Sequence, residues 1–456
     1  MTSVYRGVDR RVWQMAFARA VNTMGLSLVM SFLAIYVVER RGYPAWVYGM
    51  IALAANLAQS MSNAWAGSLS DRIGRRPLIT NALFVRSGFV ALLGTQITLA
   101  APLWTIGANI VVSSTLRGCF EPVAYALVAD VARDDQRVAA FGIQRMGTNL
   151  GWAIGPALGG VLTLVISYGA VFYIAAAGLI ITGIVTLGVE DPTSGGAAPA
   201  SGGAAPGSPR EVLARRPPSG GAAPGSPREL KSPRSSRTSP PSDDLRSMLR
   251  EAIADRVMRM MLLGTLLCAL LETQMFSTFS IYMTEKLHLT TADVGLLYMC
   301  NGLGVLVLQF PALALIRRFG IRVMLPWSSA FDALGFALIG LGSGFAGGAI
   351  SILVLTCAEV LFDPSQQAAI AEVADPAHRG RAYGVVGFAS MIGIAFAPLL
   401  GGVLLDVIGD HHVVMWLAIA TIGGAQTLCF TAFVRRRRRS LDVAPMIADA
   451  RRDPKV

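Results

Sequence analysis

Charged residues are scarce in this sequence. They make up 15% of the 456 residues, whereas hydrophobic residues make up 53%. A soluble globular chain carries about a quarter charged residues, so too few are present here to cover a surface exposed to water. The shortage argues against an ordinary soluble chain and indicates that most of the molecular surface contacts lipid.

Cysteine and histidine are also scarce, with five and four residues. The cysteines stand singly and form no CxxC pair, which argues against a disulfide framework and a zinc site. The histidines lie in or near loops, and no nucleophile–base spacing or Walker A sequence occurs. We therefore expect no enzyme activity, no metal, no cofactor and no ATP-driven pumping by this chain.

The N-terminus lacks the features of a cleaved signal peptide, because Arg6, Arg10 and Arg11 lead directly into an apolar run without a small-residue cleavage site. The formal net charge of +11 could suggest nucleic-acid binding. The basic residues, however, stand in short loops between apolar runs, where they set the orientation of a membrane protein. We therefore expect no nucleic-acid partner.

Twelve apolar runs are long enough to cross a bilayer as helices, for which about twenty residues are needed. They are rich in Ala, Leu, Gly and Met and lack the alternation of a membrane β-barrel, so the fold class is all-α. The expected spans are residues 13–38, 44–70, 77–98, 103–131, 138–165, 168–189, 257–285, 291–317, 321–344, 347–373, 380–408 and 412–434.

The loops between these spans alternate in charge. Those on one side hold most of the arginines, whereas those on the other side hold only Arg40, Arg41 and Lys286. Because basic loops stay in the cytoplasm, we expect both termini and the central loop to be cytoplasmic and the protein to lie in the inner or plasma membrane. The arginines Arg435 to Arg439 are expected to fix the inner end of the last span near anionic lipid.

The chain divides into two halves around a low-complexity segment. Residues 201–211 (SGGAAPGSPRE) recur unchanged at 219–229, and a Pro-, Gly-, Ser- and Ala-rich segment of this kind is expected to be disordered. The predicted parts are a six-helix bundle (1–190), a linker (191–242), a second six-helix bundle with a lead-in (243–434) and a basic tail (435–456). The lead-in is either an amphipathic helix on the inner leaflet or a simple connection.

The two halves repeat one another in sequence. Phe120-Glu121-Pro122 recurs as Phe362-Asp363-Pro364, and Ile35-Tyr36 recurs as Ile281-Tyr282. Each pair falls in the equivalent span of its half. Two homologous six-helix halves are typical of transporters that rock about a central site near the middle of the membrane.

The loop between spans 2 and 3 identifies a family. Residues 67–76 read GSLSDRIGRR and closely resemble the loop signature of the major facilitator superfamily. The resemblance implies a latch that holds the halves together on the cytoplasmic side, with Gly67 allowing close approach of another helix and Arg75 paired with Asp130. The residues assigned to it are Gly67, Asp71, Arg72, Gly74, Arg75, Arg76 and Asp130.

Residues 151–160 (GWAIGPALGG) in span 5 are similar to the antiporter motif of the same superfamily. Pro156 removes a backbone donor, and the glycines permit close packing; the motif residues are Gly151, Gly155, Pro156, Gly159 and Gly160. Span 11 has a similar Ala397-Pro398 version, so a general packing surface is the alternative. Arg117 lacks the Gln-Gly that follows this arginine in drug exporters of the family.

Ionisable residues inside spans are functional candidates. The resemblance implies that spans 1, 4, 7 and 10 line the cavity, and it gives proton-coupling candidates Asp363, Glu359, Glu272 and Glu121. Asp363 ranks first, because Glu359 shares its helical face and Pro364 follows it. Arg117 stands four residues before Glu121, so we expect these two to neutralise each other. Structural ion pairing is the alternative for each acid.

Further cavity candidates are polar, aromatic or basic, with interhelical hydrogen bonding as the alternative for each. They are Arg19, Asn22, Tyr36, Arg117, Tyr125, Gln274, Tyr282 and Gln366. The sequence predicts a secondary transporter, acting as a monomer, that couples protons to export of small amphiphilic molecules. Proton-coupled uptake of a metabolite and, more remotely, a membrane sensor remain alternatives.

The predicted orientation can be tested at the central loop. A cysteine introduced at Ser208 is expected to react with membrane-impermeant thiol reagents only from the cytoplasmic side, because the linker joins two Arg-rich ends. Labelling is compared between intact cells and inverted vesicles. Reaction in intact cells would reverse the orientation.

Overall fold

The structure is a computed structural model that describes residues 7–133, 136–190, 245–374 and 379–450. Within these ranges the protein is a bundle of helices without a β-strand. The low-complexity linker (191–242) lies outside the described residues, so its predicted disorder stays a prediction.

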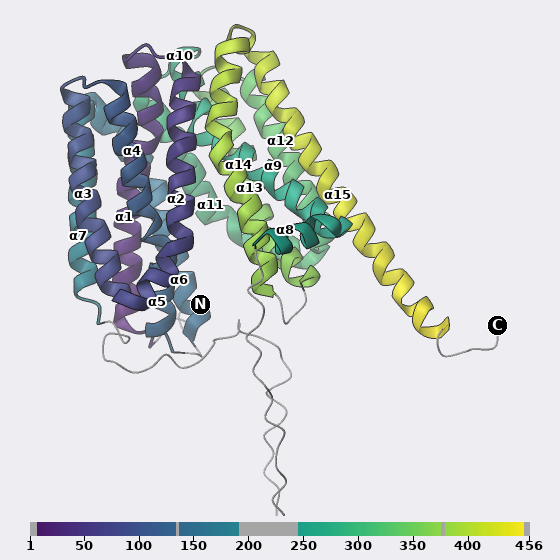
Figure 1. The fold of residues 1–456 in the computed structure, drawn as a ribbon. Helices are drawn as coiled ribbons and strands as arrows, with labels where there is room; N and C mark the ends of the chain where they lie inside the picture. The colour runs from purple at the N-terminus through teal and green to yellow at the C-terminus, as the bar shows by residue number, and fades with distance from the viewer. Residues whose placement is uncertain (1–6, 134–135, 191–244, 375–378, 451–456) are drawn as a thin grey trace, which may run out of the picture.

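The first half forms six antiparallel spans (Figure 1). Its elements are α1 (Arg10–Ile35) with the π-helical turn η1 (Tyr36–Arg40), α2 (Ala45–Ile73), α3 (Arg75–Thr98), α4 (Leu103–Gly118), α5 (Glu121–Val131), α6 (Arg137–Val165) and α7 (Tyr168–Leu187). All six spans expected from the sequence are present, since α4 and α5 together make up the fourth.

The second half repeats this arrangement after a short helix. Its elements are α8 (Leu245–Ala254), α9 (Arg256–Phe276), α10 (Thr278–Glu285), α11 (Thr291–Phe319), α12 (Ile321–Leu341), α13 (Gly344–Val373), α14 (Arg379–Ile408), the turn η4 (Gly409–His411) and α15 (His412–Ala450). Helix α8 contacts α9 and α14, but several of its apolar side chains lie outside the described residues. The choice between the two interpretations of this segment therefore stays open.

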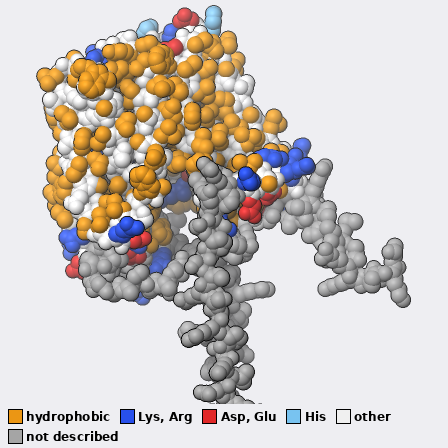
Figure 2. All heavy atoms as spheres, viewed as in Figure 1, with side chains coloured by type: hydrophobic (Ala, Val, Ile, Leu, Met, Phe, Trp, Pro, Cys, Tyr) orange, Lys and Arg blue, Asp and Glu red, His pale blue; other side chains and the backbone are white. Residues whose placement is uncertain are grey.

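The described helices have the composition of membrane spans. Among the described residues, nine stretches are long and apolar enough to cross a bilayer, and one of them, Arg381–Arg436, includes most of α14 and the first part of α15. The two further spans, α2 and the α4–α5 pair, are absent from those nine. Figure 2 shows the result as a wide band of hydrophobic side chains, with charged side chains gathered at its two ends.

Two spans expected to be continuous are broken. Helix α4 ends at Gly118 and α5 begins at Glu121, because Pro122 has no N–H to continue the backbone ladder. Helix α9 ends at Phe276, and Ser277 leaves helical geometry before α10 begins. At that break the Gln274 side chain donates to the Ala397 carbonyl (2.8 Å) and accepts from the Thr278 hydroxyl (2.6 Å).

Two seams join the halves: α6 packs against α11, and α2 packs against α14. We call the end of the bundle where α7 ends and α9 begins the linker end, and the opposite end, which carries η1 and α10, the far end (Figure 1). Helix α15 continues past the linker end of the bundle, where it carries the arginines that follow Val434.

The seams are closed at the far end. Gly160 lies against the backbone of Thr291, and Gly402 lies against the backbone of Ala45. A Cβ atom at Gly402 would be 2.6 Å from the Ala45 carbonyl oxygen, so a larger residue would force the helices apart. The hydroxyl groups of Thr163 and Thr291 are 2.7 Å apart across the α6–α11 seam.

Asp406 of α14 adds a specific contact to the α2–α14 seam. Helix α2 begins after Pro44, which offers no side-chain cap. The carboxylate of Asp406 instead accepts hydrogen bonds from the backbone N–H groups of Ala45 (3.0 Å) and Trp46 (2.8 Å). The first turn of a helix in one half is therefore capped by an acid from the other half, and only while the far end is closed.

The linker end is open. Gly67 and Gly142 of the first half, and Gly384 and Gly387 of the second, have no described atom of another segment within 4 Å of a Cβ position. The expectation that Gly67 receives a closely packed helix is therefore wrong for this conformation, because the ends of the helices are separated there. Arg145 of α6 and Asp363 of α13 still make a half-exposed ion pair of 3.1 Å between the halves.

The cap from Asp406 predicts a conformational effect. Loss of a helix N-cap costs about 1 kcal/mol, so Asp406→Ala should shift the equilibrium toward an open far end about fivefold. Spin labels at the exposed residues Tyr43 and Val407 would report the distance distribution across this seam.

Asp410→Ala is the matched control, because Asp410 pairs with Lys286 (3.2 Å) inside one half. An unchanged distribution in Asp406→Ala, or an equal change in the control, would contradict the role given to this cap.

Candidate functional site

A cavity of about 540 Å³ lies between the two halves. It is bounded by α1, α2, α4 and α6 on one side and by α9 and α14 on the other. Its size suits a small organic molecule, and most of its wall is apolar. The polar lining residues are Asn56, Gln59, Ser60, Asn63, Ser114, Arg117, Glu272, Thr273, Ser277 and Ser390.

Arg117 is the basic residue of this lining. Its Nη1 atom lies 3.4 Å from Gln59 Oε1 and 3.9 Å from Met30 Sδ, which are weak contacts for a guanidinium. Its Nε atom is buried without a hydrogen-bond partner. Among the described residues, Arg117 makes no ion pair.

Glu272 of α9 is the acidic residue of the lining, and it borders a second cavity as well. The second cavity, of about 90 Å³, lies within the second half and is also lined by Asp332 and Glu359. Glu359 accepts from Asn301 (3.2 Å) and Asp332 accepts from Gln426 (3.2 Å). Three carboxyl groups thus surround one small space, and none makes an ion pair within the described part of the chain.

The halves carry opposite charges at equivalent positions. Arg117 precedes Glu121 by four residues, and Glu359 precedes the repeat residue Asp363 by the same number. Likewise, Arg86 follows Gly74 by twelve residues, as Asp332 follows Gly320. The buried surface of the first half is therefore positive where that of the second half is negative. Arg86 and Asp332, whose role the sequence leaves open, are thus a pair of equivalent positions with opposite charges.

Glu121 does not pair with Arg117, contrary to expectation. It makes an ion pair with Arg19 of α1 (2.8 Å), whose guanidinium also lies over the ring of Tyr125 (3.9 Å to its centre). The break between α4 and α5 separates Arg117 from Glu121, because the spacing of four residues no longer follows one helix. Arg19 is almost fully buried, so this pair takes the structural role that was the alternative for these residues.

Several predicted cavity residues make interhelical contacts outside the lining of the central cavity. Asn22 accepts from Arg86 (3.2 Å), and Gln366 donates to Thr265 (2.8 Å). Gln274 holds the break after α9, as described above. In these cases a hydrogen bond inside one half satisfies a buried polar group that has no access to water.

The two repeat-related tyrosines lie near the far end. The Tyr36 hydroxyl donates to the Ile97 carbonyl (3.4 Å) and accepts from Arg41 (3.1 Å). Tyr282 is fully buried and meets the ring of Trp416 edge-on, with 5.4 Å between ring centres. Both rings fill space inside their own half, so they support the closed end rather than the cavity.

Asp363, the first-ranked acid, lies outside both cavities in this conformation. Its carboxylate accepts from Arg145 of the other half and is partly exposed at the linker end. Arg145 was missed by sequence reasoning, since one arginine in a Gly-rich span gives no signal of its partner. The ion pair compensates the charge of Asp363, whereas Glu272 and Glu359 make no ion pair with any described residue.

The family loop has the expected ion pair. Arg75 contacts Asp130 (2.7 Å) and approaches Asp71 (4.0 Å), which is largely exposed. Gly74 separates α2 from α3 with φ at +90°, a region that glycine enters without strain. Arg72 and Arg76 flank this turn at the end of α2 and the start of α3. All these contacts stay within the first half.

The motif in α6 packs on both of its sides. Gly151, Gly155 and Gly159 lie against the backbone of α1, while the Pro156 carbonyl and Gly160 face α11 of the other half. Trp152, between them, lines the cavity and lies 4.7 Å from Phe276 of α9, measured between ring centres. These aromatic cavity residues were missed, because a Trp within a packing motif is not distinctive.

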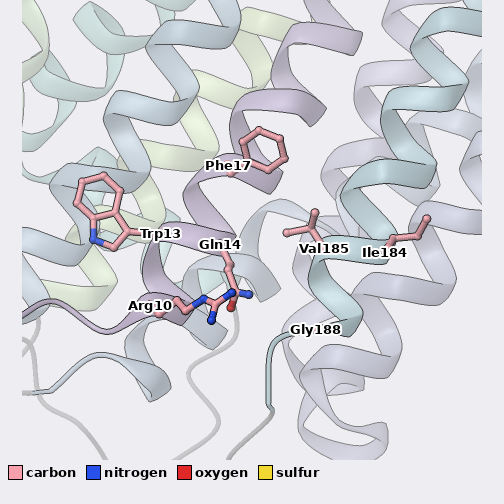
Figure 3. Close-up of a pocket in the computed structure, with 7 residues that line it drawn as sticks. All are labelled: Arg10, Trp13, Gln14, Phe17, Ile184, Val185 and Gly188. Carbon is pink, nitrogen blue, oxygen red and sulfur yellow. The ribbon is translucent and has the colours of Figure 1, made fainter.

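A third hollow lies on the outer surface, at the linker end of α1 and α7 (Figure 3). Its volume is about 530 Å³, and it is lined by Arg10, Trp13, Gln14, Phe17, Ile184, Val185 and Gly188. Trp13 and Phe17 are about half exposed. Aromatic rings beside an arginine at the end of an apolar band are typical of the lipid–water interface, so we assign this groove to membrane lipid.

Comparison with known proteins agrees with this architecture. The family model of the Major Facilitator Superfamily matches residues 15–251 and 261–453. An uncharacterized MFS-type transporter of Bacillus subtilis (strain 168), YqjV, is 23% identical over 437 residues, which are 94% of each chain. The multidrug resistance protein MdtH of Klebsiella pneumoniae is 29% identical over 159 residues, 34% of this chain and 39% of MdtH.

Solved structures share the fold at low sequence identity. The nucleoside transporter NupG has a TM-score of 0.69 at 14% identity, with 93% of this chain and 99% of NupG covered. A bacterial homolog of the lysosomal transporter Spinster, in an inward-facing conformation, has a TM-score of 0.63 at 13% identity, with coverage of 93% and 96%. The family match over both halves and the paired six-helix bundles show that this protein belongs to the major facilitator superfamily of membrane transporters.

Proposed function

We propose that the protein is a proton-coupled exporter of small amphiphilic molecules, acting as a monomer in the inner or plasma membrane. The observation that carries this proposal is the position of Glu272, which borders both the central cavity and the small acidic cavity. The Glu272 carboxyl group can therefore interact both with a molecule bound between the halves and with a proton held inside the second half.

The electrostatics of the small cavity favour proton binding. Glu272, Asp332 and Glu359 line a space of about 90 Å³ in a low-dielectric interior. Like charges so placed repel one another, and uptake of a proton relieves the repulsion without any change in shape. If a substrate displaces that proton from Glu272, the two ligands exchange across the membrane, which is antiport.

The conformation agrees with alternating access. The far end is closed by the glycine contacts and Asp406, and the linker end is open at Gly67, Gly142 and Gly384. We propose that the linker end faces the cytoplasm, because most Arg-rich loops are there. A substrate would then enter from the cytoplasm, as export requires.

Export is also supported by the packing of α6. Its motif, which is similar to the antiporter motif, contacts α1 and α11 at once, and Trp152 reaches the cavity between them. Movement of one half against the other would therefore change the cavity wall through α6 directly. The partial similarity to the multidrug resistance protein MdtH points in the same direction.

Proton coupling predicts different effects for different acids. Glu272→Gln and Glu359→Gln should abolish pH-gradient-driven accumulation in proteoliposomes, because each removes a proton site of the uncompensated cluster. Glu359→Gln should retain downhill exchange, since Glu359 does not line the central cavity. A panel of candidate compounds is screened under an imposed gradient, and the direction of net flux distinguishes export from uptake.

Asp363→Asn is the matched control, because this acid is ion-paired and lies outside both cavities. It should keep gradient-driven transport. If Asp363→Asn loses the coupling while Glu272→Gln and Glu359→Gln keep it, the proton site lies at Asp363 and the ranking from the sequence is right. If all three variants keep it, coupling through these acids is excluded.

The family loop predicts a second effect. Gly67→Leu meets open space in this conformation, so the variant should fold normally. It should slow transport by about 5- to 150-fold if closing of the linker end brings another helix onto Gly67, since overpacking costs about 1–3 kcal/mol. Asp71→Asn should act in the same direction by weakening the latch.

Ser68→Leu is the control for bulk, because Ser68 is also exposed and lies on a different side of α2. Transport rates and melting temperatures are measured for all three variants. Normal rates in Gly67→Leu and Asp71→Asn would show that closing the linker end does not involve this loop.

A further inference from the structure

The central cavity has one basic and one acidic side chain, and they come from opposite halves. Arg117 projects from α4 and Glu272 from α9, and both belong to the lining of the same space of about 540 Å³. The geometry points to a substrate that carries an anionic group for Arg117 and a cationic amine for Glu272, that is, a zwitterionic amphiphile. This inference rests on the proposed function and names the substrate class of that site.

Arg117 lacks the partners that a buried guanidinium needs. Its contacts with Gln59 and Met30 are long, and its Nε atom has none. Arg19 also has buried Nε and Nη2 atoms without partners, but it makes an ion pair with Glu121, whereas Arg117 makes none among the described residues. A guanidinium presents paired N–H groups that match a carboxylate or phosphate, so an anionic group in the cavity would supply the missing hydrogen bonds.

Glu272 has the complementary requirement. Its one hydrogen bond is accepted from the Cys268 thiol at 3.5 Å, which is a weak donor. Within the described residues it has no ion-pair partner, and Asp332 and Glu359 of the adjoining cavity add negative charge. An ammonium group would be attracted by all three acids, whereas a second anion would be repelled.

The rest of the wall fits the body of an amphiphile. Trp152 and Phe276 lie 4.7 Å apart, between ring centres, with one ring from each half. Phe276 follows Glu272 by one helical turn, so an aromatic or aliphatic group beside the amine would contact these rings. Asn56, Gln59 and Asn63 of α2 also line the cavity and add polar groups to this wall.

A set of four fluorescent probes on one scaffold tests the inference. Nα-dansyl-lysine is a zwitterion, its methyl ester is a cation, its Nε-acetyl derivative is an anion, and the doubly blocked compound is neutral. Binding to the full-length protein in lipid nanodiscs is measured by fluorescence titration without a pH gradient. The zwitterion should bind at least about tenfold more tightly than each other probe, as one charge-assisted hydrogen bond requires.

Two variants test which cavity residue binds each charged group of the probe. Arg117→Gln should reduce the affinity for the zwitterion to that for the methyl ester and leave the ester unaffected. Glu272→Gln should reduce the affinity for the zwitterion to that for the acetyl derivative, and the affinity for the acetyl derivative itself should not fall. Lys286→Gln and Asp410→Asn remove one positive and one negative charge at the far end, outside the cavity lining, and should preserve the order of the four probes.

Equal affinities for the four probes, no binding of any probe, or an order unchanged by Arg117→Gln and Glu272→Gln would overturn the inference. Such a result with intact gradient-driven flux would leave the proposed proton-coupled export standing. Conversely, charge-selective binding without gradient-driven flux would retain the substrate class and exclude the coupling.

Discussion

Charge inside a low-dielectric bundle requires compensation, and this constraint organises the protein. The first half holds Arg19, Arg86 and Arg117 against Glu121 alone, and the second half holds Glu272, Asp332 and Glu359 without an ion-pair partner in the described chain. Within a half, the charges are only partly satisfied. Arg117 and Glu272 face the space between the halves, and Glu272, Asp332 and Glu359 face the small acidic cavity, where a substrate or a proton can compensate them. Arg86, by contrast, is held inside the first half by Asn22.

The repeat explains how such an arrangement arises on one backbone. Equivalent positions carry Arg117 and Glu359 in one pair, and Arg86 and Asp332 in the other. Two copies of a six-helix unit supply equivalent positions, and substitution then gives each copy its own sign of charge. The symmetry is also broken at the far end, where α11 has its own capping box while α2 takes its cap from Asp406 of the other half.

In this conformation an end of the bundle is closed where glycines of one half pack against the backbone of the other half, and open where they do not. Close contacts of Gly160 and Gly402 join the halves at the far end, whereas Gly67 and Gly384 face open space at the linker end. Both sets are glycines, so a rocking motion could exchange the contacts without steric conflict. The ion pair of Arg145 and Asp363 joins the halves in this conformation, although Gly67 and Gly384 face open space.

The sequence by itself determined the twelve spans, the two related halves and the family, because apolar length, repeated residues and the GSLSDRIGRR loop are all local patterns. It also anticipated the Arg75–Asp130 pair. Only the tertiary structure decided the partners of the buried charges: Glu121 lies against Arg19, Asp363 against Arg145, and Glu272 between two cavities. Those partners come from helices distant in sequence, and a break such as that between α4 and α5 changes which side chains can meet, so spacing along the chain could not give them.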